Sequence, residues 1–441
     1  MSYASKYLYP LLIIFLSGLA SLSLSACGGD DTEVSNPTPV LVTVVFATEA
    51  PAATATAAKT TPTATGAVAE VGFGVSTAEP GSVLPAADRP ADVNPLTGLK
   101  VDDPALLQRR PLMVRVGNDP GARPQVSLNE ADLVYEEIVE WWVTRFTAIY
   151  LSRDPEMIAP IRSARLINLQ LAPQYQAALA HSGGSDPVRW ELSQSEIVNL
   201  DEFFVPSPYF YRPNEGWQTR LAFDAQAGRD YLDGEGLDSQ IKLRGFAFSE
   251  KLELEQLPKQ AVIDAGEVTI PYPRQTSQAR WSYDRQSGKY VRFTTGEPML
   301  DFNGGQITAA NVIIYFADHQ ETDIVEDSNG ATSIRIVVNG RGAAWIARDG
   351  KLLKANWDTD GRETPMFIFD DGQPAPLKPG NSWVQVVPLD YQIEIDGVAQ
   401  GIQDPAEAPA DIEAVSENPT DTPGPTLTPI GARPAATPKS P

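Results

Sequence analysis

The sequence has little of the chemistry that usually builds a metal site or a disulfide. Among 441 residues it contains one cysteine, Cys27, and two histidines, His181 and His319. A lone cysteine excludes an intramolecular disulfide and a cysteine-based zinc site, so we expect no metal, no cofactor and a fold stabilised by packing alone. Positive charge is also scarce. The 34 Lys and Arg residues face 57 Asp and Glu residues, and the net charge of -23 argues against a nucleic-acid partner.

Residues 1–26 have the pattern of a secretory signal peptide. A short segment with one cation, Lys6, precedes the apolar run Leu11–Leu16, which small residues follow. The tetrapeptide Leu24-Ser25-Ala26-Cys27 resembles the lipobox of bacterial lipoproteins, which implies lipidation of Cys27 by diacylglycerol before cleavage. Two acyl chains suffice for stable anchoring. We therefore expect an extracytoplasmic lipoprotein anchored to the cell membrane. The alternative is a plain signal peptide or signal anchor with a coincidental cysteine.

Both flanks of the chain are low in complexity. Residues 27–90 are rich in Thr, Ala and Pro, and a Pro- and Thr-rich composition returns over residues 404–441. Such segments cannot bury enough apolar surface to fold, so we predict a disordered tether and a disordered tail. The length of the remaining chain favours two folded domains between them.

Residues 94–255 mix strand and helix signals. Apolar runs at 112–116 and 146–151 predict buried strands. Residues 163–179 carry apolar side chains at helical spacing with Pro173 as an interruption, and Asp224 can cap a helix over 224–232. We predict a mixed α/β domain in this region.

Residues 267–395 contain short strands at regular spacing. The runs 333–338, 343–347 and 383–387 are rich in β-branched and aromatic residues. Turns are predicted at Ser287-Gly288, Asn339-Gly340, Asp349-Gly350 and Asp371-Gly372. The pattern predicts an all-β domain, either a sandwich or a barrel. The fold class is therefore α+β, with a mixed α/β domain followed by an all-β domain.

A series of short motifs follows one another along the first of these domains. They are Asn94-Pro95-Leu96-Thr97-Gly98, Arg110-Pro111, Ala122-Arg123-Pro124-Gln125, Ala131-Asp132-Leu133-Val134-Tyr135-Glu136, Thr144-Arg145-Phe146, Ile161-Arg162-Ser163-Ala164-Arg165 and His181-Ser182-Gly183-Gly184-Ser185. In this order they resemble the YerB-like lipoprotein family. The resemblance implies an exported, two-domain bacterial protein. It does not specify a biochemical activity. The family pattern has Gly-Gly between an acidic residue and the Thr-Arg pair, where this chain has Trp141-Trp142-Val143.

The sharpest candidate site combines arginines with a glycine-rich turn. Guanidinium forks suit a phosphate or carboxylate, while the turn and a helix that begins near Ser163 would add backbone N–H groups and positive potential. Alternatively, the arginines hold loops by bonding carbonyl groups or by pairing with Asp132, Glu136, Glu137 and Glu140. The ligand-binding candidates are Arg123, Arg145, Arg162, Ser163, Arg165, His181 and Ser185.

Other motifs favour structural roles. His181 has no acid placed beside it for a triad, and the spacing Ser239-x-x-Lys242 lacks the companion motifs of acylating serine enzymes. The segments that begin at Asp327 and Asp358 are typical of hairpin turns, because neither is followed by the glutamate that closes a calcium loop. Aromatic residues over 190–217 can stack on sugars, and loop packing is the more common role.

These observations favour a noncatalytic lipoprotein that binds an anionic or glycan ligand of the cell envelope, or a partner protein. The alternative is a cell-envelope enzyme that acts on phosphorylated glycan or polyprenyl-phosphate carriers. This hypothesis rests on the pattern Pro160-x-Arg162-Ser163-x-Arg165, which resembles the pyrophosphate-binding arginines of the LytR-CpsA-Psr phosphotransferases. A third reading is a scaffold that recruits envelope proteins. No catalytic residue is assigned.

Overall fold

The computed structural model describes residues 85–239 and 241–402. The predicted signal peptide, Cys27, most of the predicted tether and the predicted tail lie outside these residues. Among the described residues, no helix is long and apolar enough to cross a membrane.

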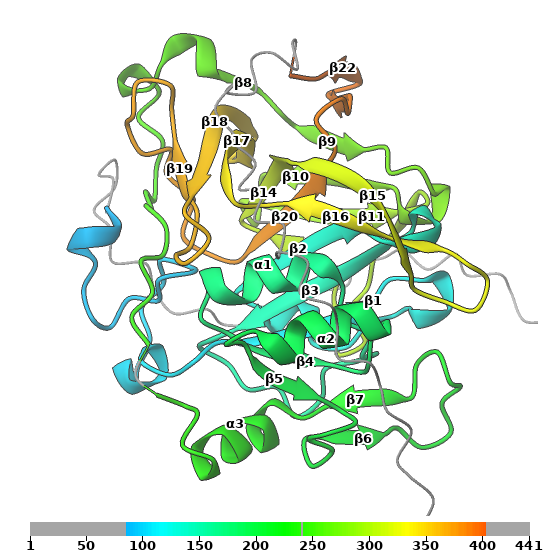
Figure 1. The fold of residues 1–441 in the computed structure, drawn as a ribbon. Coiled ribbons are helices and arrows are strands. Elements are labelled where there is room, and N and C mark those ends of the chain that lie inside the picture. Colours follow the sequence, from blue (N-terminus) through cyan, green and yellow to red (C-terminus); the bar gives the residue numbers. More distant parts are fainter. Residues whose placement is uncertain (1–84, 240, 403–441) are drawn as a thin grey trace, which may run out of the picture. The chain divides into compact units, whose positions relative to one another are not determined.

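The main sheet takes strands from both halves of the sequence. Its order is β19-β18-β17-β14-β20-β2-β3-β1-β4-β5, and β8 pairs with β18. Strand β2 runs parallel to β20, with Leu133 opposite Ser382 (Figure 1). The sheet therefore continues across the boundary that we predicted between residues 255 and 267. Its strands are β1 (Leu112–Gly117), β2 (Leu133–Ile138), β3 (Thr144–Tyr150), β4 (Ala178–His181), β5 (Val198–Asp201), β8 (Val262–Asp264), β14 (Asn311–Phe316), β17 (Gly340–Arg348), β18 (Lys351–Thr359), β19 (Met366–Ile368) and β20 (Ser382–Val387).

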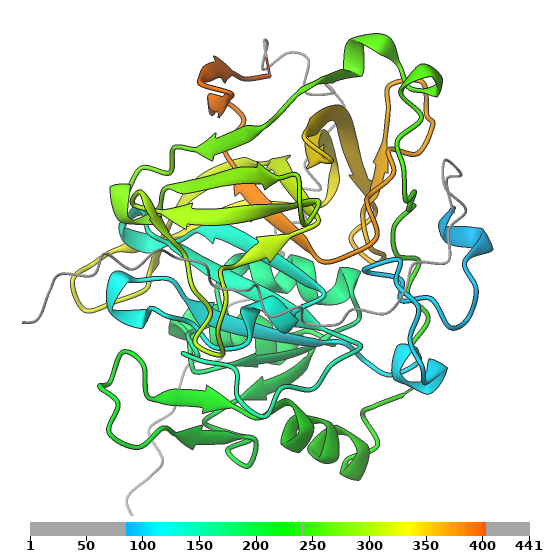
Figure 2. The same cartoon turned by 180° about the vertical axis from the view of Figure 1, so that it is seen from behind.

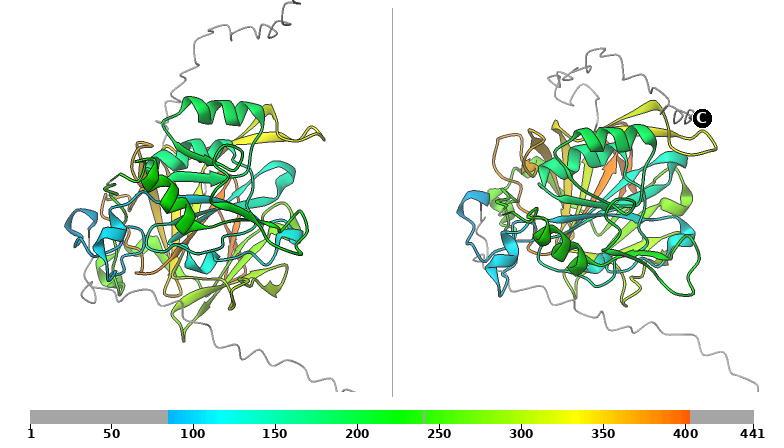
Figure 3. Two further views of the ribbon diagram at one scale, coloured as in Figure 1. Left: turned by 90° about the horizontal axis from the view of Figure 1, so that it is seen from below. Right: turned by 60° about the horizontal axis from the view of Figure 1, so that its bottom comes forward.

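Three α-helices are described: α1 (Leu166–Gln174), α2 (Asp186–Gln194) and α3 (Ala225–Gly234). Leu171 of α1 and Val188 of α2 pack in one core with Met113 and Ile149 of the main sheet, so both helices cover the same face of that sheet (Figure 3). The carboxylate of Asp224 accepts a hydrogen bond from the backbone N–H of Ala227, which confirms the predicted cap of α3.

The predicted helix over 163–179 is too long at both ends. The segment before Leu166 is extended, and Gln176 has a positive φ of 48° that helices do not allow. Residues 178–181 then form β4 at the centre of the strand order β1-β4-β5. Short 3₁₀ turns occupy Ala86–Asp88, Pro104–Leu107, Pro120–Ala122, Leu128–Glu130, Glu140–Trp142, Leu254–Gln256, Lys259–Ala261 and Gln275–Ser277.

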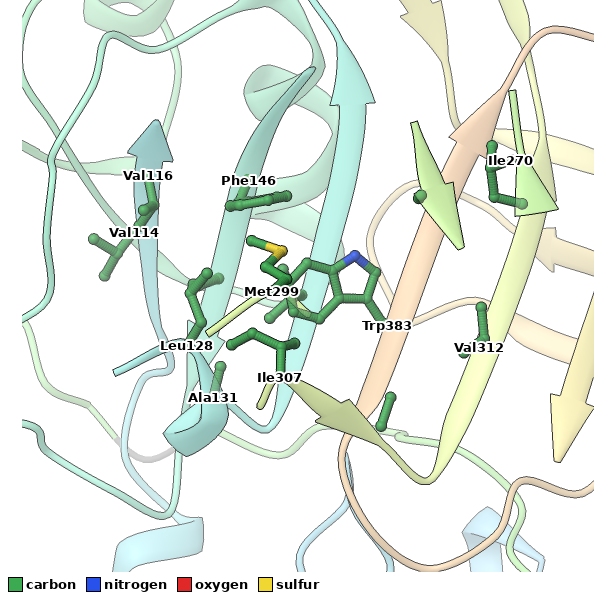
Figure 4. Close-up of a cluster of buried hydrophobic side chains, with 14 of the residues drawn as sticks. Val114, Val116, Leu128, Ala131, Phe146, Ile270, Met299, Ile307, Val312 and Trp383 are labelled. Atoms are coloured by element: carbon green, nitrogen blue, oxygen red, sulfur yellow. The ribbon is translucent and has the colours of Figure 1, made fainter. Parts of the chain in front are cut away.

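A second sheet packs on the opposite face of the main sheet. Trp281 of β10 and Tyr290 of β11 share a core with Phe146 and Trp383 of the main sheet. Figure 2 shows the second sheet beside the main sheet, and Figure 4 shows Phe146 and Trp383 in this core. The ring centroids of Phe146 and Trp383 are 5.1 Å apart in an edge-to-face arrangement. Two sheets thus face each other as in the predicted sandwich, and one of them is shared with the N-terminal half. The second sheet contains β9 (Glu267–Ile270), β10 (Ala279–Asp284), β11 (Lys289–Thr294), β12 (Glu297–Pro298), β13 (Thr308–Ala309), β21 (Ile393–Ile395) and β22 (Val398–Gln400).

Two hairpins stand apart from these sheets. They are β6 (Tyr209–Tyr211) with β7 (Leu221–Phe223), and β15 (Asp318–Val325) with β16 (Thr332–Val337). The second hairpin projects beside α1 (Figure 3), where the amide of Gln170 donates to the carbonyl of Ile336 at 2.7 Å. Within the main sheet, Asp349 and Gly350 have φ of 52° and 69° between paired residues of β17 and β18, which confirms the predicted tight turn.

Candidate functional site

The two motifs singled out from the sequence lie side by side. The segment 162–165 runs between β1 and the turn that follows β4. The N–H of Ser182 donates to the carbonyl of Arg162, and the N–H of Ala164 donates to the carbonyl of Gly183, both at 3.0 Å. Main-chain hydrogen bonds therefore hold the arginine segment against the glycine-rich turn.

A group of charged side chains fills the space between the main sheet and the start of α1. Glu137 on β2 lies opposite Arg145 on β3, and Arg115 on β1 lies opposite Thr147, so these side chains share the face that α1 covers. Arg165 immediately precedes α1. We call Arg115, Glu137, Glu140, Arg145 and Arg165 the arginine–glutamate cluster.

Glu140 is the anionic centre of the arginine–glutamate cluster. Its Oε1 accepts from Nη2 of Arg145 at 2.6 Å, and its Oε2 accepts from Nε of Arg165 at 2.7 Å. A second N–H of Arg165 also donates to Oε1. Burial of Glu140 opposes ionisation, but the charges of Arg145 and Arg165 outweigh it and lower the pKa to about 2. Glu140 is therefore ionised over the whole physiological pH range.

Glu137 behaves differently from Glu140. Its Oε1 accepts from Nη1 of Arg115, while its Oε2 is buried and has no hydrogen-bond partner among the described residues. Burial raises the pKa of Glu137 to about 7, although Arg115 acts in the opposite direction. The charge of the cluster thus changes near neutral pH.

The arginines of the cluster retain unused donors. Within the described part of the chain, Nε and Nη1 of Arg145 and Nη2 of Arg115 are buried without a hydrogen-bond partner. An unsatisfied buried donor costs about 1–3 kcal/mol, and more when it is charged. Burial, with the neighbouring charge of Arg165, lowers the pKa of Arg145 to about 10, so its guanidinium stays cationic. The cluster can therefore accept an oxyanion.

The tip of the β15–β16 hairpin covers the arginine–glutamate cluster. The side chain of Glu326 at this tip is fully buried, and its Oε2 lies 3.3 Å from Nη1 of Arg165. The next residue, Asp327, accepts a hydrogen bond from the indole of Trp141 at 2.7 Å. Asp327 also accepts from the backbone N–H groups of Asn329 and Ala331, an arrangement that forms the hairpin turn expected there.

The two tryptophans beside Glu140 occupy positions suited to glycine. Trp141 and Trp142 have φ of 62° and 59°, in the left-handed region that side chains with a Cβ disfavour. Glycine would adopt this backbone without strain. Both indoles are about half exposed, at 46% and 47%. They form the outer rim of the cluster.

Two of the candidate arginines have structural partners instead. Arg162 donates to the carbonyls of Ile161 and Gln218, and Arg123 donates to the carbonyls of Asn118 and Thr276. Bonding to carbonyls is one form of the alternative role that the sequence left open for the arginines, and the pairing of Arg145 and Arg165 with Glu140 is its other form. Ser163 contributes its carbonyl, which accepts from Nε of Arg115 at 3.2 Å.

His181 and Ser185 lie in the adjacent turn. His181 is fully buried, with Nδ1 2.8 Å from the carbonyl of Gly183 and Nε2 2.7 Å from Oδ1 of Asn199. Burial lowers its pKa, which favours a neutral, packed side chain. Ser185 precedes α2, and its buried hydroxyl has no partner among the described residues.

Two members of this region were not recognised from the sequence. Arg115 was treated only as part of a strand, and Glu326 was not singled out. The available signal for Arg115 is a charge in the middle of the apolar run Leu112–Val116, because a buried cation requires a buried counter-ion. No comparable signal marks Glu326.

Comparison with known proteins identifies relatives over most of the described residues. Two family models match, the "Protein of unknown function (DUF3048) N-terminal domain" over residues 96–238 and the corresponding C-terminal domain over residues 268–384. "Putative lipoprotein YerB" of Bacillus subtilis (strain 168) is 26% identical over 301 residues, which cover 67% of this chain and 86% of that protein. The crystal structure of YerB protein from Bacillus subtilis has the same fold, with a TM-score of 0.56 at 24% identity, and the match covers 67% of this chain and 96% of that chain. The chain therefore belongs to the DUF3048 family.

Proposed function

We propose that this chain is an extracytoplasmic lipoprotein, anchored through Cys27, whose folded body binds an anionic ligand at the arginine–glutamate cluster. The name of the Bacillus subtilis relative, together with the lipobox pattern at Leu24–Cys27, supports the anchor. The observation that carries the ligand assignment is the set of three buried guanidinium nitrogens, Nη2 of Arg115 and Nε and Nη1 of Arg145, that lack an acceptor among the described residues.

The charge balance of the cluster favours an anion over water as the missing acceptor. When Glu137 is protonated, Arg115 loses its ion-pair partner, while Arg145 and Arg165 share Glu140 and Arg165 also lies beside Glu326. A carboxylate or phosphate oxygen matches the fork of a guanidinium, and charge-assisted hydrogen bonds are about twice as strong as neutral ones. The ligand class is therefore a phosphate or carboxylate group, as carried by an anionic envelope glycan.

Entry to the cluster requires movement of the β15–β16 tip. Glu326 places a carboxylate of the chain itself 3.3 Å from Arg165. An incoming anion would replace this carboxylate, and the tip would release its bond between Asp327 and Trp141. Glu326 thus competes with the ligand in this proposal.

Titration of the purified full chain with inorganic phosphate tests the ligand assignment. We expect Arg145→Gln to weaken binding roughly tenfold or more, because it removes two unused donors and a positive charge. Arg335→Gln is the matched control, since Arg335 forms a half-exposed pair with Glu191 at 3.8 Å on the surface. Glu326→Gln removes the competing carboxylate and should strengthen phosphate binding. A misfolded protein would not gain affinity, so this variant separates a role in binding from a defect in folding. Absence of phosphate binding in both the unmodified chain and Glu326→Gln would refute the site.

Two further measurements separate the remaining alternatives. Mass analysis of the membrane fraction should find two acyl chains on Cys27, and Cys27→Ala should release the protein from the membrane. Incubation with a phosphorylated polyprenyl carrier tests the enzyme alternative. Turnover that disappears in Arg165→Ala would replace the binding role by a catalytic one.

A further inference from the structure

A large cavity lies at the β19 end of the main sheet, away from the arginine–glutamate cluster. Its volume is about 1110 Å³, and no member of the cluster lines it. Three segments form most of its walls: the first described residues from Pro85 to Pro95, the connection from Ile241 to Ala247, and residues 363–368 around β19. Leu107, Gln108 and Pro374 complete them. We call it the edge cavity.

The walls of the edge cavity are mainly hydrocarbon. Leu107, Ile241, Leu243, Phe246 and Phe367 line it, and each is less than a tenth exposed in the folded chain. Protein interiors are packed closely, so a space of this size beside buried apolar side chains is suited to a ligand. Such walls favour an aliphatic chain as the occupant.

The polar groups of the edge cavity carry positive charge. Arg89, Lys242 and Arg244 line it together with a single carboxylate, Glu363, so its walls carry a net charge of +2 in a chain whose net charge is -23. Within the described residues, Nη1 of Arg89 and Nε of Arg244 are buried without a hydrogen-bond partner. These donors and this charge are complementary to an anionic head group.

Main-chain carbonyls and Glu363 hold the two arginines in place. Nη1 of Arg244 lies 2.8 Å from Oε2 of Glu363, and Nη2 of Arg244 donates to the carbonyl of Thr364. Nη2 of Arg89 donates to the carbonyls of Leu243 and Arg244, at 3.0 and 2.7 Å. Gly245 follows with φ of 69°, and a Cβ at that position would lie 2.3 Å from the carbonyl oxygen of Pro95 and 2.8 Å from Nη1 of Arg89. Glycine thus allows the two segments to approach closely, which fixes the positive end of the cavity.

We propose that the edge cavity binds one amphipathic anion, with its hydrocarbon chain along the apolar walls and its carboxylate or phosphate head group at Arg89 and Arg244. This site is independent of the arginine–glutamate cluster. Its walls include Pro85 and Arg89, which belong to the end of the segment, residues 27–90, that the sequence predicts as the tether to the membrane. A single-chain lipid with an acidic head group has the required chemistry.

Binding of three probes that share one hydrocarbon chain tests the proposal. Full-length protein carrying Cys27→Ala, which lacks acyl chains of its own, is titrated with hexadecanoate, hexadecyl phosphate and hexadecanol below their micelle concentrations. We expect the two anions to bind at one molecule per chain, with the alcohol roughly tenfold weaker or more. The stronger of the two anions identifies the head group. Equal binding of the alcohol and both anions would overturn the proposal.

Two pairs of variants place the probe in the edge cavity. Met366 lines the cavity and is 40% exposed, so Met366→Trp should fill it and reduce binding of the preferred anion roughly tenfold, whereas the volume-conserving Met366→Leu should not. Arg244→Gln should weaken binding of the anion and leave the alcohol unchanged. Arg335→Gln, which breaks only the half-exposed surface pair with Glu191, should bind the anion as the parent does. Unchanged binding in both Met366→Trp and Arg244→Gln would remove the ligand from this cavity.

Discussion

Glu137 is the residue through which pH acts most directly on the arginine–glutamate cluster. Its pKa in the folded chain is about 7, against an ordinary value of 4.5, because burial disfavours the charged form. A raised pKa means that Glu137 stabilises the fold fully below about pH 4.5 and loses this contribution as the pH rises through about 7. We expect this group to lower the free energy of unfolding by up to roughly 1.4 kcal/mol per pH unit across that window.

Urea denaturation of Glu137→Gln and of the unmodified chain from pH 4.5 to pH 8 measures this effect. The two proteins have to be compared at each pH, because other groups also change the free energy of unfolding with pH. His181 and His319 have lowered pKa values, so their contribution to this free energy increases as the pH rises. The free energy of the unmodified chain should fall relative to that of Glu137→Gln as the pH rises. Parallel curves for the two proteins would show that Glu137 titrates normally.

Trp142, at the rim of the arginine–glutamate cluster, has a backbone conformation that substitution can test. Its φ of 59° costs a residue with a Cβ about 1 kcal/mol relative to glycine. Trp142→Gly and Trp142→Ala remove the same indole and differ only in this backbone cost. We expect the glycine variant to be more stable by about 1 kcal/mol in chemical denaturation. Equal stability of the pair would show that the turn adopts another conformation in solution.

The candidate residues show how far a residue can be placed from its sequence. Arg145 and Arg165 were both predicted as ligand-binding candidates, and the fold brings both onto Glu140. Arg162 is only three positions before Arg165, yet its guanidinium bonds the carbonyl of Gln218. The segment before α1 is extended, so the direction of each side chain depends on the neighbouring strands. Sequence spacing alone does not contain this information.

Secondary-structure elements were predictable where their composition was distinctive. The apolar runs at 112–116 and 146–151 form β1 and β3, and Asp349-Gly350 forms the expected turn. The prediction that this helix extends to residue 179 was wrong, because residues 177–180 are a short apolar run, which fits a buried strand as well as a helix. Tertiary pairing with β1 and β5 decides in favour of the strand β4.

The β15–β16 hairpin shows a different limit at the same scale. Its turn at Asp327 follows from the Asp-Ser-Asn-Gly sequence. Its position over the arginine–glutamate cluster comes from contacts with α1, where Gln170 bonds both Ile336 and Val338 of the hairpin segment. These partners are more than 160 residues apart in the sequence, and no local pattern connects them.

Across the whole molecule, the main sheet joins segments that appear separate in the sequence. Strand β20 lies between β14 and β2 and is parallel to both. Glu136 on β2 accepts two hydrogen bonds from Arg292 of the second sheet, at 2.6 and 3.1 Å, and one from the indole of Trp383 on β20 at 3.1 Å. Each half of the chain therefore supplies partners for buried polar groups of the other half.

This arrangement leads to an expectation for fragments of the chain. Residues 85–255 alone would leave β2 without its neighbour β20 and would leave Glu136 without Arg292 and Trp383. The fragment would also expose the apolar face of β2 and β3, where Phe146 packs with Trp281 and Trp383 in the complete chain, and the lost burial is large compared with the stability of an ordinary domain. We expect this fragment to be digested rapidly in limited proteolysis and to show no cooperative unfolding.

Coexpression of residues 85–255 with residues 256–402 provides the control. Both fragments together contain every strand of the main sheet, so we expect them to associate and to recover protease resistance. The unbroken chain should unfold in a single transition, because β20 couples the two halves through backbone pairing on both of its edges. Cooperative unfolding of residues 85–255 in isolation would contradict this expectation. It would show that the N-terminal half is stable without the strand it receives from the C-terminal half.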